Sequence, residues 1–222
     1  MSETASILSI KGIGEKKAQL FHKLNIDTVH DLIHNYPQSY EKFDMPEDSS
    51  DLVCNEKISI YAQISSTPLL KNQNHKSVVT VQICTGAHTV HVIWFHMPFL
   101  KNTLKKGDSY IFYGVIQKKG NLYTMEHPKY YTKTAYQKLL GSLQPIYGLT
   151  AHLSNQAVKS AIETALSDHM EEPEYLPETF IETYSLCSNE EALHMIHFPK
   201  SMDELKTARN RLVFEEFLVF IL

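Results

Sequence analysis

Ten lysines stand between Lys71 and Lys138, in a stretch that holds no arginine and only two acidic residues, Asp108 and Glu126. The stretch is net +8, whereas the whole chain is net −4. Such segregation of positive charge directs one face of an acidic protein at a polyanion. Ten aromatic residues share the stretch; lysine attracts phosphate and aromatic faces stack on unpaired bases. Nucleic-acid binding is therefore indicated, although a strand-rich core with a solvated rim of lysines explains the composition equally well.

The chain offers no catalytic constellation. It contains no G-x-x-x-x-G-K-[ST], G-x-S-x-G or H-E-x-x-H motif. His194 and His197 stand three apart without further ligands at metal-binding spacing, so we expect satisfied helix histidines. Three scattered cysteines, Cys54, Cys84 and Cys187, suit a reducing cytoplasm and are expected to be small core residues. We therefore predict no catalytic residue, no metal and no cofactor in this segment.

Length and hydropathy set the broad class. A chain of 222 residues allows one large domain or two small ones, and 43% hydrophobic with 21% charged residues is typical of a folded soluble protein. No signal pattern opens the chain, and no apolar run approaches the ~20 residues that span a bilayer. The last six residues, Phe217–Leu222, are apolar. We expect the chain to stop inside a helix that continues into another domain; a terminal helix docked on its own core or on a partner is the alternative.

Residues 1–48 read as a helical lead-in. Apolar residues recur at helical spacing from Ile7 to Leu24, and Thr28 is expected to cap a second helix that ends before Pro37. Ile10–Ala18 resembles a helix-hairpin-helix turn, in which two glycines permit a tight turn and backbone N–H groups hold a phosphate. A hairpin that only packs two helices together explains the turn equally well. The candidate phosphate contacts are Gly12, Gly14, Lys16 and Lys17.

Residues 49–135 read as strands rich in β-branched and aromatic residues and separated by turn residues. The expected strands are 58–64, 77–83, 89–95, 109–116 and 122–125. Five short strands, with a polar loop Lys71–Lys76 after the first and a longer excursion before the fourth, match an OB-fold β-barrel, which binds single strands across one face and through its loops. Candidate phosphate contacts are Lys71, Lys76, Lys101, Lys105, Lys106, Lys118 and Lys119.

Residues 136–222 read as a helical, acidic connector, which makes the fold class α+β. Ser154 is expected to cap a helix whose apolar stripe runs from Ala157 to Leu166. Between Asp168 and Glu191 the chain is strongly acidic. Because this face would repel DNA, we expect it to be solvated or packed on another domain.

Several motifs are specific enough to compare with known families. They are Ile10–Gly14 followed by Thr28–Ile33, Tyr36–Glu41, Trp94–Leu100, Pro145–Thr150, Ile196–Pro199 and Ala208–Glu216. In this order, over essentially the whole chain, they resemble the N-terminal part of the RecG family of bacterial ATP-dependent DNA helicases. That family remodels stalled replication forks and Holliday junctions.

The resemblance implies that the barrel is a wedge, which inserts at a DNA branch point while a motor pulls the duplex. Phe95 and Phe99 then stand on the wedge loop and stack on unpaired bases at the junction. The alternative is that Phe95 belongs to the strand core and Phe99 packs under the loop; the residues alone favour this alternative for Phe95. The resemblance also implies a monomer in the bacterial cytoplasm, associated with the nucleoid, with branched DNA and the motor domains of the parent chain as partners. ATP and Mg²⁺ belong to that missing motor.

The sequence departs from the family pattern at two places. Gln38 and Ser39 stand where the family often has a basic pair, which argues against a phosphate contact there. His96 stands where the family usually has asparagine, a change that bears on how the loop is held.

We therefore expect the branched-DNA-binding wedge of a helicase acting in recombination and repair, which binds DNA without turning over ATP. Two alternatives stay open. One is a general single-strand-binding OB module, with little preference for branches. The other is a protein-interaction domain without DNA affinity, whose acidic helices and apolar tail dock a partner.

Overall fold

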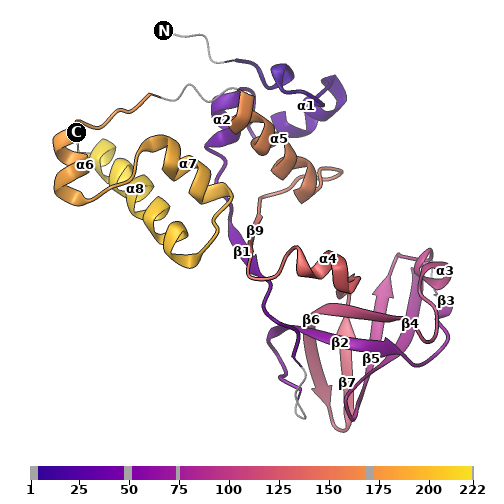
Figure 1. The fold of residues 1–222 in the computed structure, drawn as a ribbon. Helices are drawn as coiled ribbons and strands as arrows, with labels where there is room; N and C mark the ends of the chain where they lie inside the picture. The colour runs from indigo at the N-terminus through magenta and orange to yellow at the C-terminus, as the bar shows by residue number, and fades with distance from the viewer. Residues whose placement is uncertain (1–4, 48–51, 74–75, 169–172, 222) are drawn as a thin grey trace. The chain divides into compact units, whose positions relative to one another are not determined.

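The computed structural model describes residues 5–47, 52–73, 76–168 and 173–221 (Figure 1). The chain divides into two compact units. Unit 1 combines residues 1–42 with residues 142–222, and unit 2 consists of residues 43–141. The helical segments expected at the two ends of the sequence therefore fold together in one unit, and the strand-rich segment between them forms the other.

Unit 2 is built on a seven-stranded, mostly antiparallel sheet (Figure 1). Along the sheet the order is β2, β4, β5, β7, β6 and β8, β3 pairs with β4, and β2 also pairs with β6. β5 and β7 run parallel. The strands are β2 (Lys57–Ile64), β3 (Leu69–Gln73), β4 (Lys76–Thr85), β5 (His88–Phe95), β6 (Ser109–Lys119), β7 (Leu122–Glu126) and β8 (Lys129–Tyr131).

The five strands expected from the sequence are confirmed as β2, β4, β5, β6 and β7. The expected loop Lys71–Lys76 is wrong in part, because Lys71 lies in β3, opposite Val78 of β4. An edge strand exposes one side to water and therefore accepts the polar residues that also mark loops. Residues 74–75 of that loop lie outside the described residues. Gly107 and Gly120 occupy the turns before β6 and β7, with φ of 97° and 61°.

Alternate strand residues fill the core of unit 2, as the period of a half-buried strand requires. Val90, Val92 and Trp94 of β5 are buried, and α3 (Leu100–Thr103) adds Leu100 to the same core. A second cluster packs Tyr136 of α4 (Lys133–Gln137) against aromatic and aliphatic residues of the sheet.

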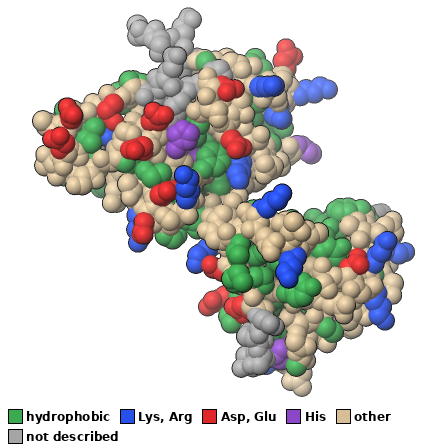
Figure 2. Space-filling model, in the orientation of Figure 1, with side chains coloured by type: hydrophobic (Ala, Val, Ile, Leu, Met, Phe, Trp, Pro, Cys, Tyr) green, Lys and Arg blue, Asp and Glu red, His purple; other side chains and the backbone are tan. Residues whose placement is uncertain are grey.

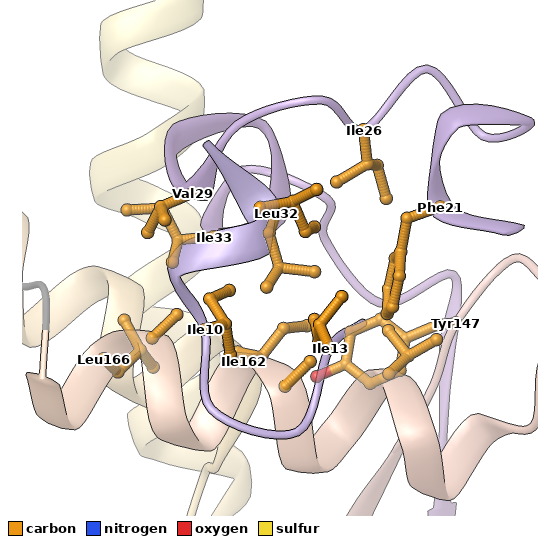
Figure 3. Packing of buried hydrophobic residues seen from close by; sticks show 14 of the residues in the cluster. Ile10, Ile13, Phe21, Ile26, Val29, Leu32, Ile33, Tyr147, Ile162 and Leu166 are labelled. Carbon is orange, nitrogen blue, oxygen red and sulfur yellow. The ribbon is translucent and has the colours of Figure 1, made fainter. Parts of the chain in front are cut away.

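The first core of unit 1 joins both ends of the chain (Figure 3). It packs η1 (Ile7–Ser9), α1 (Glu15–His22) and α2 (Val29–Ile33) against α5 (Asn155–Asp168). Figure 3 shows Ile10, Ile13 and Leu32 gathered around Ile162 of α5. Burial of this apolar set is what holds the short helices, which are too short to be stable alone.

The helix caps expected in unit 1 are confirmed. Thr28 and Asp31 form a capping box at the start of α2, and Ser154 Oγ accepts the Ala157 N–H at 3.2 Å at the start of α5. The turn expected within Ile10–Ala18 divides the apolar set that runs from Ile7 to Leu24. Gly12 has a φ of 88°, so the chain leaves η1 in a turn and α1 begins at Glu15.

The last three helices are α6 (Glu178–Tyr184), α7 (Asn189–His197) and α8 (Met202–Ile221). Ala192 and Ile196 of α7 pack against Ala208 and Leu212 of α8, in a cluster that includes Leu143. Beyond Leu212 most apolar residues of α8 are exposed, and Phe217 is 63% and Phe220 88% accessible, whereas Phe214 and Leu218 are half-buried.

The sequence does not predict a two-stranded sheet in unit 1. β1 (Ser39–Lys42) pairs antiparallel with β9 (Leu143–Ile146), with Tyr40 opposite Pro145. Each strand has four residues, and its partner lies about a hundred residues away along the chain, so local periodicity carries no signal for it. The pairing places two of the family-like motifs side by side. Tyr40 then donates from its hydroxyl to the carbonyl of Ile196.

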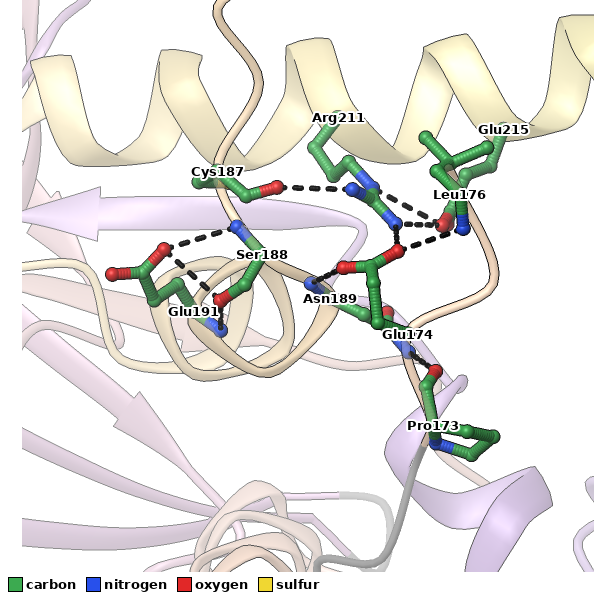
Figure 4. Close-up of polar contacts among 9 residues, drawn as sticks. All are labelled: Pro173, Glu174, Leu176, Cys187, Ser188, Asn189, Glu191, Arg211 and Glu215. Carbon is green, nitrogen blue, oxygen red and sulfur yellow. Dashed lines mark hydrogen bonds and ion pairs between the residues drawn. The ribbon is translucent and has the colours of Figure 1, made fainter. Parts of the chain in front are cut away.

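The acidic stretch was expected to be solvated or packed on another domain, but part of it makes contacts within unit 1. Glu174 binds Arg211 of α8, which is fully buried and also contacts Glu215 (Figure 4). Glu191 closes a capping box with Ser188 at the start of α7. Glu171 and Glu172 lie outside the described residues.

The three cysteines are free thiols, and the expectation of core positions is wrong for Cys84, which is exposed. Cys54 and Cys187 are half-buried. Among the described residues, no helix is long and apolar enough to cross a membrane.

Candidate nucleic-acid interface

A short loop, His96–Phe99, joins β5 to α3; we call it the 96–99 loop. His96 has a φ of 58°, and its backbone N–H donates to the Ser77 carbonyl at 2.8 Å. Asparagine and histidine tolerate this left-handed conformation better than most residues. The backbone conformation at this position therefore suits histidine as well as asparagine.

Phe99 stands at the end of the loop and is 58% exposed. The alternative in which it packs under the loop is therefore wrong. Its neighbour Leu100 is 1% exposed and enters the core of unit 2, so α3 anchors the loop while leaving the Phe99 ring accessible. An exposed phenylalanine on a short anchored loop is suited to stacking on a flat aromatic ligand.

Phe95 lies on the outer face of the sheet, opposite Val78, which is itself opposite Lys71. These three side chains therefore share one row across β3, β4 and β5. The Phe95 ring packs on His127, with ring centroids 5.3 Å apart, and is half-buried. Its own backbone N–H donates to His127 Nε2 at 3.2 Å. Phe95 is thus held against His127 and is not part of the strand core.

A hollow of about 350 Å³ opens between the 96–99 loop and the start of β8. Trp94 is buried in its floor, where the indole N–H donates to the Pro128 carbonyl at 3.0 Å. The close approach of Pro128 depends on Gly114, because a Cβ there would lie 3.3 Å from Pro128. The lining residues are Trp94, Met97, Phe99, Leu100, His127, Pro128, Lys129, Tyr130 and Tyr131.

The candidate lysines are not gathered in one patch. Lys71 shares the row of Phe95, and Lys101 follows the 96–99 loop on α3. Lys118 and Lys119 lie at the turn from β6 to β7, where Lys118 faces the Tyr123 ring at 5.1 Å and Tyr123 pairs with Val90 near the start of β5.

Lys105 and Lys106 precede Gly107, whose N–H donates to the Ile64 carbonyl at the end of β2. The side chain of Lys76 lies outside the described residues. On the face seen in Figure 2, blue side chains appear at several separate points of unit 2.

Charge is nevertheless divided between the units. Unit 2 contains eleven lysines and seven acidic residues, so it is net +4 within a chain of net −4. Red side chains are numerous over unit 1 in Figure 2. The expected segregation of charge therefore follows the division of the chain into units.

The hairpin candidates lie together on the surface of unit 1. Gly12 has a positive φ and Gly14 is the N-cap of α1, so both glycines serve the turn. Lys17 turns back and donates to the Gly12 carbonyl at 2.9 Å, while Lys16 is exposed. The turn has the shape expected, and its phosphate contact stays a prediction.

No group of three or more potential metal ligands occurs among the described residues. His197 is a satisfied core histidine, as expected. Its ring lies 3.0 Å from the Tyr147 hydroxyl and 2.7 Å from the Ile33 carbonyl. Burial lowers its pKa to about 4, which keeps the ring neutral. His194 is exposed.

The family model that matches this chain describes the RecG wedge domain and covers residues 6–168. The chain belongs to the RecG wedge domain family. Two curated relatives are named ATP-dependent DNA helicase RecG. The one from Bacillus subtilis is 26% identical over 98% of this chain, and the one from Thermotoga maritima is 29% identical over 94%.

The same family provides a solved structure, RecG bound to a three-way DNA junction. It matches 99% of this chain with a TM-score of 0.78 and 26% identity. The chain spans about a third of the length of these proteins: 32% of the Bacillus relative, 27% of the Thermotoga relative and 30% of the solved chain. The recognition of a RecG wedge from the sequence motifs is thus confirmed.

The segment His127–Tyr131 lines the hollow and is not among the candidates that the sequence offered. Its strand and turn pattern does not mark it, because it reads as the end of one strand and the start of a loop. The available signal is Lys129 directly followed by two aromatic residues, the mixture that marks the whole stretch from Lys71 to Lys138.

Proposed function

We propose that this chain is the branched-DNA-binding wedge of an ATP-dependent DNA helicase that acts on replication forks and Holliday junctions in recombination and repair. The observation that carries the proposal is the exposed Phe99 ring on its anchored loop, in a chain whose whole length matches RecG bound to a three-way junction. A base that loses its partner at a branch gains ~1–3 kcal/mol when it stacks on an aromatic side chain.

The scaffold of this wedge is a closed five-stranded OB barrel. The pairings of β2 with β4, β4 with β5, β5 with β7, β7 with β6 and β6 with β2 return to the first strand, which supports closure. β3 and β8 are then additions at its margins. Closure leaves few free edges and presents loops at the barrel ends, where the 96–99 loop lies.

Residues 1–48 and 136–222 serve as lead-in and connector for the wedge at 49–135, and α8 leads toward the helicase motor domains of the longer parent protein. ATP and Mg²⁺ act in that motor, outside this chain. The wedge itself is monomeric and contacts phosphates through its dispersed lysines.

Fluorescence anisotropy tests the proposal with three labelled DNAs, a model fork, a matched duplex and a single strand, at two salt concentrations. We expect the fork to bind most tightly and all affinities to fall with salt. Phe99→Ala should weaken fork binding about fivefold or more. Tyr61→Ala is the matched control, because Tyr61 is 50% exposed on β2, outside the loop.

Each alternative has its own outcome. Equal binding to fork and single strand would indicate a general single-strand-binding module. Absence of binding at low salt would favour a protein-interaction domain. ATP hydrolysis by the purified chain would contradict the assignment of the motor to the rest of the parent protein.

A further inference from the structure

The hollow beside the 96–99 loop has two walls from different parts of the sequence. One wall carries Met97 and Phe99, and the other is formed by the segment His127–Tyr131. Trp94 also lines the hollow and is 1% exposed. The volume of the hollow, about 350 Å³, lies in the range of small-ligand sites.

The lining is suited to a ligand that has a flat ring system and carries an anionic group. Aromatic and sulfur-containing side chains offer apolar and π surface, which suits an uncharged ring system. Lys129 stands at the exposed edge of the second wall. A ring joined to a phosphate, as in a nucleotide, combines both features.

His127 gives this wall a directional polar group. Its Nε2 accepts the Phe95 N–H, so the proton of the neutral ring resides on Nδ1, which remains a donor. The φ of 47° at His127 fixes the backbone in the left-handed region, so the ring position is set by the turn before β8. His127 thus faces Phe95 on one side and lines the hollow with its own side chain.

Resting on the function proposed above, we infer that the hollow receives one unpaired base at the branch point. The base stacks between Phe99 and the His127–Tyr131 wall. Its adjoining phosphate lies near Lys129. His127–Tyr131 is therefore a second DNA-contacting segment of the wedge, and Phe95 contributes from outside the hollow by holding His127.

The test compares two model forks that differ only at the first unpaired nucleotide of the branch. In the intact fork this nucleotide carries its base, and in the abasic fork the base is missing. His127→Asn removes the ring and keeps a residue that tolerates positive φ. His96→Asn is the matched control, since His96 has a φ of 58° and does not line the hollow. Met97→Ala, on the opposite wall, is a second test variant.

We expect His127→Asn and Met97→Ala to weaken binding of the intact fork about fivefold. For the abasic fork, the affinity of both variants should match that of the wild type within about twofold, because the base that these side chains contact is already missing. His96→Asn should match the wild type on both forks. Trp94 is the only tryptophan of the chain, so the intact fork should also quench its fluorescence more than the abasic fork does.

Equal losses on both forks, or no loss on either, would overturn the inference, as would identical quenching by the two forks. Failure of the proposed function is distinguishable, because the wild type would then show no preference for fork over duplex. Trp94 emission and circular dichroism of each free variant establish that it is folded before it is compared.

Discussion

The guanidinium of Arg211 lies 2.5 Å from a carboxylate oxygen of Glu174, although 37 residues separate them. Arg211 also contacts Glu215 at 2.6 Å and donates to the Cys187 carbonyl at 3.1 Å (Figure 4). Burial favours a raised pKa for Glu174, but hydrogen bonds from Arg211 and from the backbone N–H groups of Leu176 and Asn189 outweigh it and lower the pKa. One buried cation therefore ties the segment before α6 and the start of α7 to α8.

Replacing Arg211 by methionine should lower the free energy of unfolding of unit 1 by about 3 kcal/mol. Methionine retains much of the buried volume, but two carboxylates and one carbonyl lose their partner. Urea denaturation followed by circular dichroism at 222 nm measures the change in the helical unit. Trp94 fluorescence reports unit 2, which contains the only tryptophan, and should not change.

Arg209→Met provides the control on the same helix. Arg209 is exposed and lies 5.7 Å from the Tyr40 ring, so its loss should lower the free energy of unfolding by less than about 1 kcal/mol. Equal effects of the two substitutions would contradict a special role for Arg211.

The stability of unit 1 should fall as the pH falls from about 6.5 toward 4. His197 is fully buried, and burial lowers its pKa from 6.5 to about 4. In that window the unfolded chain binds a proton that the folded unit does not, so protonation favours unfolding. The loss amounts to about 3 kcal/mol across the window. Denaturation at a series of pH values, followed at 222 nm, measures it.

His197→Gln should remove most of that dependence on pH, at the expense of some stability at neutral pH. His194→Gln is the control, since His194 is exposed on the same helix. A pH profile that is unchanged in His197→Gln would show that another group is responsible.

Substitution of Phe99 and substitution of Phe95 should differ in their effect on the stability of unit 2. Phe99→Ala removes an exposed ring and should change the free energy of unfolding of unit 2 by less than about 0.5 kcal/mol. Phe95→Ala removes the half-buried ring that packs on His127 and should lower that free energy by about 1 kcal/mol. Denaturation followed by Trp94 fluorescence measures both. A larger loss for Phe99→Ala would mean that this ring belongs to the core.

Gly114→Ala should lower the free energy of unfolding of unit 2 by about 1–3 kcal/mol, because the new Cβ would lie 3.3 Å from both Cα and Cβ of Pro128. Trp94 donates to the Pro128 carbonyl, so its emission should shift as well. An unchanged midpoint and spectrum would indicate that the turn before β8 moves away freely.

The sequence by itself determined the features that depend on neighbouring residues. Alternation of β-branched and aromatic residues predicted five strands, and side-chain chemistry predicted the caps at Thr28 and Ser154. These rest on interactions within a few residues, which a single sequence displays. The ordered motifs also identified the family. The roles of the lysines and of Phe95 and Phe99 in DNA binding remain predictions.

Only the tertiary structure decided which distant residues meet. It paired β1 with β9, buried Arg211 against Glu174, left Phe99 exposed, and brought the segment His127–Tyr131 and the 96–99 loop to the lining of one hollow. It also separated the lysines that composition had grouped. Burial and pairing depend on contacts between residues far apart in the chain, and a local pattern of charge or hydropathy does not encode them.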